Sequence, residues 1–175
     1  MIFGVGYPIL LAYVIVSDRG RSKEEGDATE HVFSLLVPAL NEEEVIEATL
    51  DAILNLDYPE GKFEVVVIDD GSNDETSAIV RDFVSRHPGQ VRLQSIPVAA
   101  SRRGKASALN AGYAHLRESS PFRNETSWII GIFDADGRPD ADMLQKVSHQ
   151  FIDPAVGGVQ SSVRIRNSGA TWIAR

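Results

Sequence analysis

Acidic, amide and hydroxyl side chains follow three short apolar runs of this sequence. The three segments are 38–42 (PALNE), 69–72 (DDGS) and 134–137 (DADG). Oxygen-rich side chains of this kind suit a hard divalent cation such as Mg²⁺ or Mn²⁺, which completes its shell with water and substrate phosphates. Each segment also fits a plain turn or helix cap, because Asn, Asp, Gly and Ser are common there. The chemistry therefore depends on whether the three segments meet.

Asp134 and Asp136 stand two positions apart at the end of the last apolar run. At this spacing both carboxylates could share one cation, or one could hold the cation and the other a sugar hydroxyl. A calcium loop would need an acid or an amide at position 138, where the sequence has Arg138. A D-x-D pair is a weak signal by itself, so a simple turn stays open as the alternative.

One basic cluster lies in the middle of the sequence, at 101–107 (SRRGKAS). Lys105, at the start of a predicted helix, could meet a phosphate together with the unpaired backbone N–H groups there. A P-loop would need Gly at position 99 and Ser or Thr at position 106, and both are alanine. The alternative is a solvated basic turn.

The elements that would position these residues alternate between strand and helix. We predict strands at 32–37, 63–68, 91–96, 128–133 and 158–165, and helices from about 41, 72, 105 and 143. Asn41 with Glu44, and Ser72 with Glu75, have the spacing of capping boxes at helix starts. Alternation of this kind predicts an α/β fold with a mostly parallel sheet flanked by helices. Because ligands bind at the carboxyl ends of such strands, the polar segments should converge there.

The net charge and the absence of cysteine exclude several classes of function. The chain has 175 residues, a formal net charge of -8, 43% hydrophobic residues and no cysteine. These values are typical of a globular domain. The acidic balance argues against nucleic-acid binding as the main function, and the lack of cysteine excludes disulfides, thiolate metal sites and a cysteine nucleophile.

The first residues differ from the rest. Residues 2–16 carry no charge, and Arg19, Arg21 and Lys23 follow shortly after. We expect segment 1–16 to be the end of a transmembrane helix, with a polar linker at 17–30 and a domain at 31–175 on the cytoplasmic side. The run is short of the ~20 residues that span a bilayer. A buried or partner-covered apolar arm is therefore the alternative.

Several ordered strings resemble family 2 glycosyltransferases with the Rossmann-like GT-A fold. They are 37–42 (VPALNE), 67–76 (VIDDGSNDET), 104–110 (GKASALN), 133–136 (FDAD) and 159–164 (VQSSVR). The string at 104–110 resembles the G-K-x-x-A-L-N segment of the processive membrane synthases that make cellulose, chitin, hyaluronan and poly-N-acetylglucosamine. The resemblance covers about residues 32–168 and implies a UDP-sugar as sugar donor, a saccharide acceptor and a Mg²⁺ or Mn²⁺ cofactor.

The resemblance also implies roles for individual residues. The base and ribose would lie against Pro38, Ala39, Asn41 and Glu42, and Asp70 would accept a hydrogen bond from the uracil ring. Lys105 would lie near the diphosphate, and Asp134 would face the ribose or phosphate. Asp136 would ligate the metal.

Two later motifs of the family are missing from the 175 residues. No E-D pair supplies a general base for the acceptor, and no Q-x-x-R-W follows. No catalytic residue is therefore assigned, and the base is expected beyond Arg175. We expect the donor-binding half of a metal-dependent, inverting glycosyltransferase, ending after the fifth strand and inactive in transfer by itself; a naturally short protein is the alternative.

Two other functions stay open. The missing base also permits a non-catalytic nucleotide-sugar-binding or assembly module. A sugar nucleotidyltransferase is the weaker rival, because such enzymes open with a glycine-rich, basic loop after the first strand. Segment 38–42 is neither glycine-rich nor basic.

Overall fold

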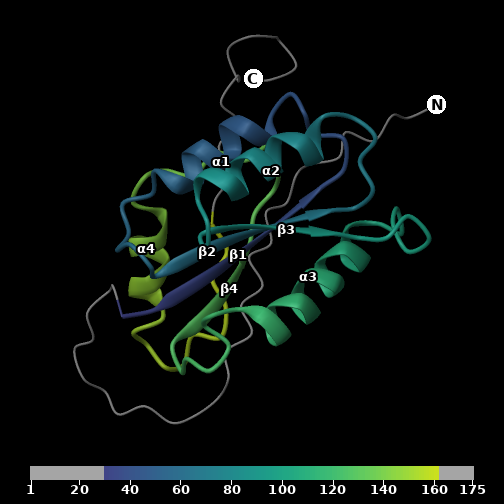
Figure 1. Ribbon diagram of the computed structural model, residues 1–175. Coiled ribbons are helices and arrows are strands. Elements are labelled where there is room, and N and C mark those ends of the chain that lie inside the picture. The colour runs from purple at the N-terminus through teal and green to yellow at the C-terminus, as the bar shows by residue number, and fades with distance from the viewer. Residues whose placement is uncertain (1–29, 162–175) are drawn as a thin grey trace, which may run out of the picture.

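Four parallel strands form the central sheet of the computed structural model, which describes residues 30–161 (Figure 1). The strand order is β3-β2-β1-β4. The strands are β1 (Val32–Ala39), β2 (Phe63–Asp69), β3 (Val91–Ser95) and β4 (Trp128–Ile132). The helices are α1 (Ile46–Leu54), α2 (Thr76–Arg86), α3 (Lys105–Ser119) and α4 (Met143–Gln150).

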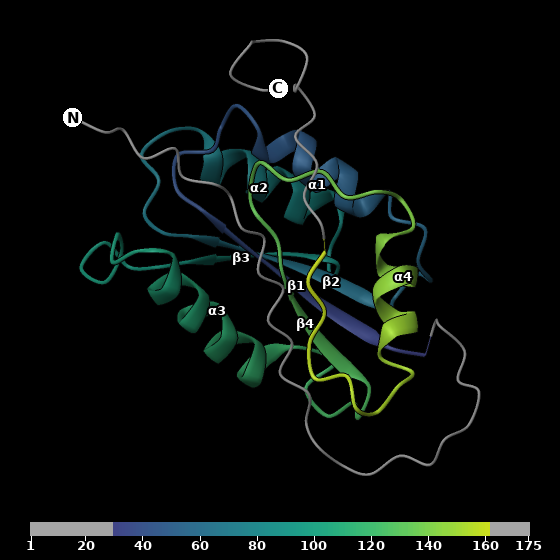
Figure 2. The same cartoon turned by 180° about the vertical axis from the view of Figure 1, so that it is seen from behind.

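Helices cover both faces of this sheet. Side chains from α1, α2 and α4 pack with Phe33, Leu35 and Val37 of β1 on one face. On the other face α3 packs with Leu36 of β1 and with Val66 and Ile68 of β2, and Figure 2 shows α3 on the side away from α1 and α2. Because both faces are covered, β1 and β2 are almost continuously apolar, as parallel strands usually are.

A glycine lets α3 approach the sheet closely. A Cβ atom on Gly112 would lie 2.3 Å from Cδ1 of Ile68 and 3.1 Å from Cδ2 of Leu36. No side chain fits at that distance, so position 112 sets how near the helix lies. The helix that begins with Lys105 is thereby held firmly against β1 and β2.

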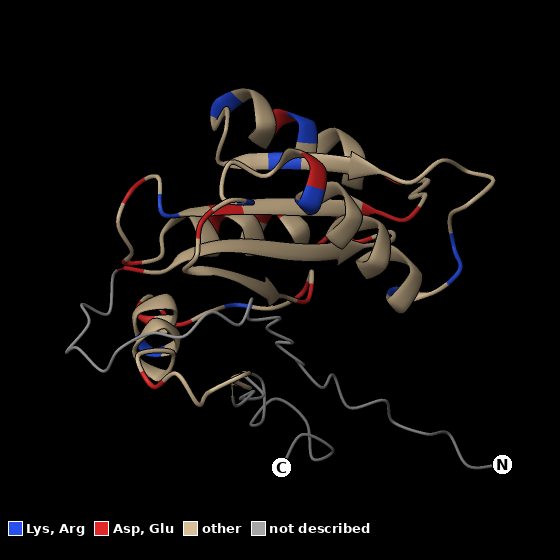
Figure 3. Ribbon diagram, turned by 90° about the horizontal axis from the view of Figure 1, so that it is seen from below, with Lys and Arg blue, Asp and Glu red and all other residues tan. Residues whose placement is uncertain are grey.

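A buried acidic network lies beneath α3. Figure 3 shows strands that are nearly free of charged residues, with Glu64 of β2 as an exception that is 1% exposed. Its carboxylate accepts hydrogen bonds from the hydroxyls of Ser34 and Ser120 at 2.6 and 2.5 Å and from Arg92 Nη1 at 2.8 Å. Buried charges are stable only with such partners. The network therefore ties β1, β2, β3 and the end of α3 together.

The register brings the carboxyl ends of the strands to one edge. Ala39 of β1 pairs with Asp69 of β2, and Leu36 pairs with Ile132 at the end of β4. The backbone continues this alignment past the strands, since Asp70 N donates to Ala39 O at 2.9 Å. The predicted convergence of the polar segments is confirmed for these three strands.

The structure confirms the α/β fold and corrects several local predictions. The four strands and α3 and α4 begin at the predicted residues, but α1 begins at Ile46 rather than near 41, and α2 at Thr76 rather than near 72. Neither α1 nor α2 has a side-chain cap hydrogen bond, so both predicted capping boxes are wrong.

The predictions for the two ends of the chain, a fifth strand and a transmembrane segment with a linker, fall mostly outside the described residues. Residues 158–161 do not form the predicted fifth strand, and 162–165 lie outside the described residues. The apolar segment 1–16 and nearly all of the linker also lie outside them. Within residues 30–161, no helix is long and apolar enough to cross a membrane.

Candidate functional site

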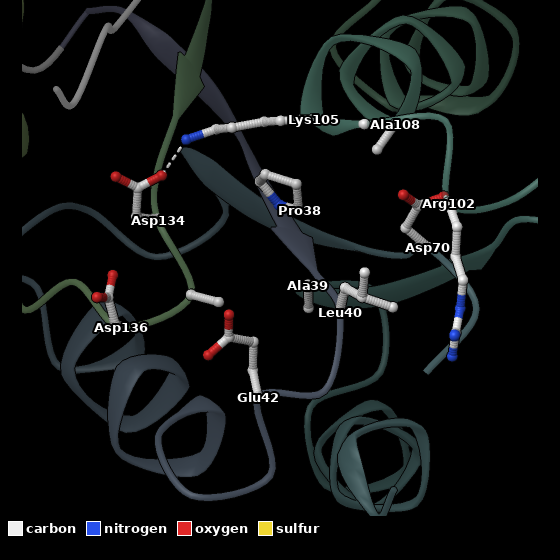
Figure 4. Close-up of a pocket in the computed structure, with 12 residues that line it drawn as sticks. Pro38, Ala39, Leu40, Glu42, Asp70, Arg102, Lys105, Ala108, Asp134 and Asp136 are labelled. Atoms are coloured by element: carbon white, nitrogen blue, oxygen red, sulfur yellow. Dashed lines mark hydrogen bonds and ion pairs between the residues drawn. The ribbon is translucent and has the colours of Figure 1, made fainter. Parts of the chain in front are cut away.

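A cavity of about 640 Å³ opens where β1, β2 and β4 end (Figure 4). Its volume lies within the ~300–1,000 Å³ usual for small-molecule sites. The lining residues are Pro38, Ala39, Leu40, Glu42, Asp70, Arg102, Gly104, Lys105, Ala108, Asp134, Ala135 and Asp136. All predicted site residues except Asn41 are among them, and their binding roles stay predictions.

Asn41 serves the contact between two loops instead of lining the cavity. Its backbone has a φ of 58°, in the left-handed region that Asn tolerates. Its N–H donates to Ser72 Oγ at 3.0 Å, and its Oδ1 accepts from Asn73 N at 2.9 Å. The loop after β1 is thus joined to the loop after β2, and Asn41 is exposed.

Further hydrogen bonds join the same two loops. Glu42 N donates to Thr76 Oγ1 at 2.8 Å, and Glu43 N donates to Asp74 Oδ2 at 3.2 Å. In the opposite direction, Glu75 N donates to Glu43 Oε2 at 2.9 Å. Polar side chains of each loop therefore accept hydrogen bonds from backbone N–H groups of the other loop, and Asp74 also accepts one from Thr76 N at the start of α2, at 3.0 Å.

Asp69 and Asp70 are adjacent but have different surroundings. Asp69 accepts hydrogen bonds from Ser72 N at 2.8 Å and from the hydroxyl of Ser77, and it does not line the cavity. Burial by itself would raise the pKa of Asp69, but the hydrogen bonds from Ser77 and Ser72 hold that pKa below its usual range. Asp69 is therefore an ionised support for the turn, and Asp70 is the carboxylate that faces the cavity.

A loop after β3 fastens Asp70. Arg102 N donates to Asp70 Oδ1 at 2.8 Å, and the guanidinium of Arg102 donates to Gly71 O at 3.2 and 2.9 Å. In Figure 4 this guanidinium points away from Lys105. Gly71 is required here, because its φ is 84° and a Cβ would lie 2.6 Å from Ser101 Oγ. The sequence predicted no role for Arg102 beyond its place in the basic cluster at 101–107.

The charges in the cavity are unevenly distributed. Lys105 forms an ion pair with Asp134 on one side, shown by the dashed line in Figure 4. Glu42 and Asp136 lie on the other side. Burial, and then the carboxylates of Asp136, Asp74 and Asp134, raise the pKa of Glu42 above its ordinary value.

The protein alone does not complete a metal site in the part of the chain that the structure describes. No group of three or more acidic or histidine side chains between residues 30 and 161 could hold an ion. Magnesium and manganese ions commonly use only one or two carboxylates and take their other ligands from water and phosphates. Glu42 and Asp136 fit that pattern, with a substrate supplying the remaining oxygens.

The four-stranded parallel sheet, with helices on both faces and a cavity at the strand ends, is GT-A-like, as solved glycosyltransferases with a similar fold show. The mannosyltransferase PcManGT from Pyrobaculum calidifontis, solved with GDP-Man and Mn²⁺, has a TM-score of 0.62 and 36% identity; the match covers 74% of this chain and 35% of that one. S. aureus TarS 1-349, solved with UDP-GlcNAc, has a TM-score of 0.53 and 27% identity, covering 70% and 31% of the two chains.

The chain belongs to glycosyl transferase family 2, whose family model matches residues 34–175. It is 34% identical to the probable glycosyltransferase YdaM of Bacillus subtilis, over 81% of this chain and 32% of that protein. It is 32% identical to the poly-beta-1,6-N-acetyl-D-glucosamine synthase of Staphylococcus epidermidis, over 85% and 32%. The beta-monoglucosyldiacylglycerol synthase of Synechocystis is 33% identical, over 81% and 27%. The chain therefore spans about a third of the length of these relatives.

Proposed function

We propose that this chain is the donor-binding half of a metal-dependent, inverting glycosyltransferase that transfers a sugar from a UDP-sugar to a saccharide or other acceptor. The observation that carries the proposal is the cavity at the strand ends, with Lys105 on one side and Glu42 and Asp136 on the other. A nucleoside diphosphate with a divalent cation has the charge distribution that complements this cavity.

The nucleoside would lie along the end of β1. Pro38 and Ala39 offer an apolar surface for the base and ribose, next to Glu42. Asp70 has one oxygen occupied by Arg102 N, which leaves the other to accept a hydrogen bond from the N–H of the uracil ring. An imide N–H pairs with a fixed carboxylate more readily than with a mobile one, so the Arg102 contact favours recognition of the base.

The diphosphate would lie between Lys105 and Asp136. Lys105 would donate to phosphate oxygens at the start of α3, where backbone N–H groups also favour anions. Asp136, with Glu42 nearby, would ligate Mg²⁺ or Mn²⁺, and that cation would neutralise the diphosphate and stabilise UDP as a leaving group. Asp134 would orient Lys105 beside the diphosphate and accept a hydrogen bond from a ribose hydroxyl.

The wider setting of the reaction is also a proposal. The apolar residues 2–16 and the basic residues after them favour attachment to a membrane, with the domain on the cytoplasmic face. Similarity to a poly-N-acetylglucosamine synthase and the G-K-x-x-A-L-N string favour a processive synthase. The general base would come from chain beyond Arg175.

Titration calorimetry on the 175-residue chain in detergent tests the donor. We expect UDP to bind in the presence of Mn²⁺ or Mg²⁺ and at least ten times more weakly with EDTA. GDP and ATP serve as competitors, because PcManGT was solved with GDP-Man. Equal UDP affinity with and without metal, or tighter binding of ATP than UDP, would contradict the assignment.

A transfer assay tests the missing half. With radiolabelled UDP-sugars the chain should release sugar slowly to water and form no polymer, because no general base for the acceptor is assigned in it. Polymer formed by the purified chain would place that base within these residues.

A further inference from the structure

A buried hydroxyl on α1 holds the turn between the two aspartates of the cavity. Thr49 Oγ1 donates to the carbonyl oxygen of Ala135 at 2.7 Å, and the two residues are 86 positions apart. Thr49 is 1% exposed and Ala135 is 4% exposed, so water does not compete for this bond. Ala135 is the residue between Asp134 and Asp136.

This hydrogen bond replaces a more usual local one. A helical threonine commonly bonds its hydroxyl to the carbonyl four residues earlier. In α1 the backbone N–H of Thr49 donates to Val45 O at 3.1 Å, and the hydroxyl leaves the helix toward the turn. Among residues 30–161, no other donor bonds to the Ala135 carbonyl. Losing the hydroxyl would leave a buried acceptor unpaired.

The bond fixes the direction in which Asp136 leaves the backbone. The Ala135 carbonyl belongs to the planar peptide that ends at the Cα of Asp136, so holding the oxygen orients that plane. Gly137 N donates to Asp134 O at 2.9 Å and closes the other side of the turn. The turn is therefore held from within by this backbone bond and from α1 by Thr49.

The same region of the chain positions both acids of the proposed cation site. Glu42 lies in the loop that leads into α1, and its N–H is bonded to Thr76 Oγ1. Thr49 lies in α1 itself and holds the turn that carries Asp136. Two carboxylates that face one cavity repel each other when no cation lies between them. The buried hydrogen bond from Thr49 to the Ala135 carbonyl opposes any displacement of Asp136 away from Glu42 by this repulsion.

We propose that Thr49 is a positioning residue whose hydroxyl, through the Ala135 carbonyl, keeps Asp136 on the same side of the cavity as Glu42 so that a divalent cation and a nucleoside diphosphate can bind. This inference rests on the proposed function, because it gives Asp136 the cation. It adds a residue that touches neither ligand and whose role is carried by one hydrogen bond.

Two variants separate the hydroxyl from the packing of the side chain. Thr49→Val keeps the shape and removes the hydroxyl, whereas Thr49→Ser keeps the hydroxyl and removes a methyl group. We expect Thr49→Val to weaken Mn²⁺-dependent UDP binding by about fivefold to tenfold, the range of one lost hydrogen bond. It should also raise the Mn²⁺ concentration needed for half-maximal binding. Thr49→Ser should stay within about twofold of the wild type, although both changes lower the melting temperature.

A control removes a buried hydroxyl at the other end of the sheet. Ser148 of α4 is 0% exposed and bonds to His31 Nδ1 at 2.8 Å, next to the start of β1. Ser148→Ala should lower the melting temperature and leave UDP binding and its Mn²⁺ dependence unchanged. Loss of UDP binding in this control would mean that destabilisation alone explains the effect of Thr49→Val, which would overturn the inference.

The remaining outcomes are distinguishable. Wild-type binding in a folded Thr49→Val, or equal losses in Thr49→Val and Thr49→Ser, would overturn the role of the hydroxyl. If Thr49→Val does not fold, Thr49→Ala replaces it in the comparison with Thr49→Ser. Wild-type UDP binding in a folded Thr49→Ala, or equal losses in Thr49→Ala and Thr49→Ser, would then overturn the role of the hydroxyl. A wild-type chain that does not bind UDP with Mn²⁺ would instead refute the proposed function, whatever the variants do.

Discussion

Lys105 and Asp134 form an ion pair across one side of the cavity, between the start of α3 and the turn after β4. This contact joins the basic cluster and the D-x-D segment, which lie 29 positions apart in the sequence. No Lys or Arg within residues 30–161 forms an ion pair with Glu42 or Asp136. On one side of the cavity the Lys105 ammonium is paired with Asp134, and on the other side the carboxylates of Glu42 and Asp136 have no basic partner within these residues.

Lys105→Met should weaken UDP binding about tenfold, because charge-assisted hydrogen bonds to phosphate are lost. The melting temperature should change little, since the side chain is 49% exposed and exposed ion pairs contribute ~0–1 kcal/mol. Lys146→Met is the matched control, because Lys146 pairs with Asp142 on α4. Calorimetry and thermal melts on both variants check this, and equal effects on UDP binding would contradict it.

Asp136→Asn should reduce metal-dependent UDP affinity by at least ~1.4 kcal/mol, a factor of ten, because the amide is a poor ligand for a hard cation. The variant should stay folded, since removing one carboxylate relieves repulsion with Glu42. Asp134→Asn should weaken UDP binding less, because an amide can still accept a hydroxyl's hydrogen bond. A stable Asp136→Asn that binds UDP normally would refute the metal assignment.

Arg102→Ala should weaken UDP binding about threefold to tenfold, because two hydrogen bonds to Gly71 O are lost and the support of Asp70 loosens. Arg103→Ala is the control at the neighbouring position. Arg103 bonds to Ala99 O at 3.2 Å, within its own loop. UDP-binding assays at matched ionic strength should separate the two variants. Similar losses of UDP affinity in both would mean that the positive charge of the loop, and not the contact of Arg102 with Gly71, explains the effect.

Glu42→Gln should change how stability depends on pH. Burial and the carboxylates of Asp136, Asp74 and Asp134 raise the pKa of Glu42 above 4.5 in the folded chain. Because the folded state holds this proton more tightly than the unfolded state, the free energy of unfolding falls as pH rises from about 4.5 through the raised pKa. The variant should thus be more stable than the wild type at neutral pH and equal to it below that window. Urea unfolding at several pH values measures this, and a variant less stable at neutral pH would contradict it.

Glu64→Gln should destabilise the domain by about 1–3 kcal/mol, because it removes the charge from a buried group that accepts three hydrogen bonds. Asp82→Asn, which breaks the exposed pair with Arg86, should cost less than about 1 kcal/mol. Urea unfolding of both variants tests the difference. Equal losses in the free energy of unfolding would mean that the buried Glu64 network contributes no more to stability than an exposed ion pair.

Local patterns in the sequence predicted the four strands and the starts of α3 and α4, but not the starts of α1 and α2. Apolar runs predicted the starts of all four strands. The helix starts at Asn41 and Ser72 were wrong, because their polar side chains bond across to the opposite loop. A capping pattern cannot reveal that another loop lies within hydrogen-bonding distance.

The sequence by itself determined that the three polar segments meet at one edge of the sheet, because parallel strands end at a common edge and these segments directly follow them. Only the tertiary structure decided what holds those residues in place. The Arg102 contact to Asp70 spans 32 positions, and the Thr49 contact to Ala135 spans 86. Such bonds depend on how helices and loops pack against the sheet, and neither propensity nor periodicity along the chain encodes which distant carbonyl or carboxylate a given side chain will meet.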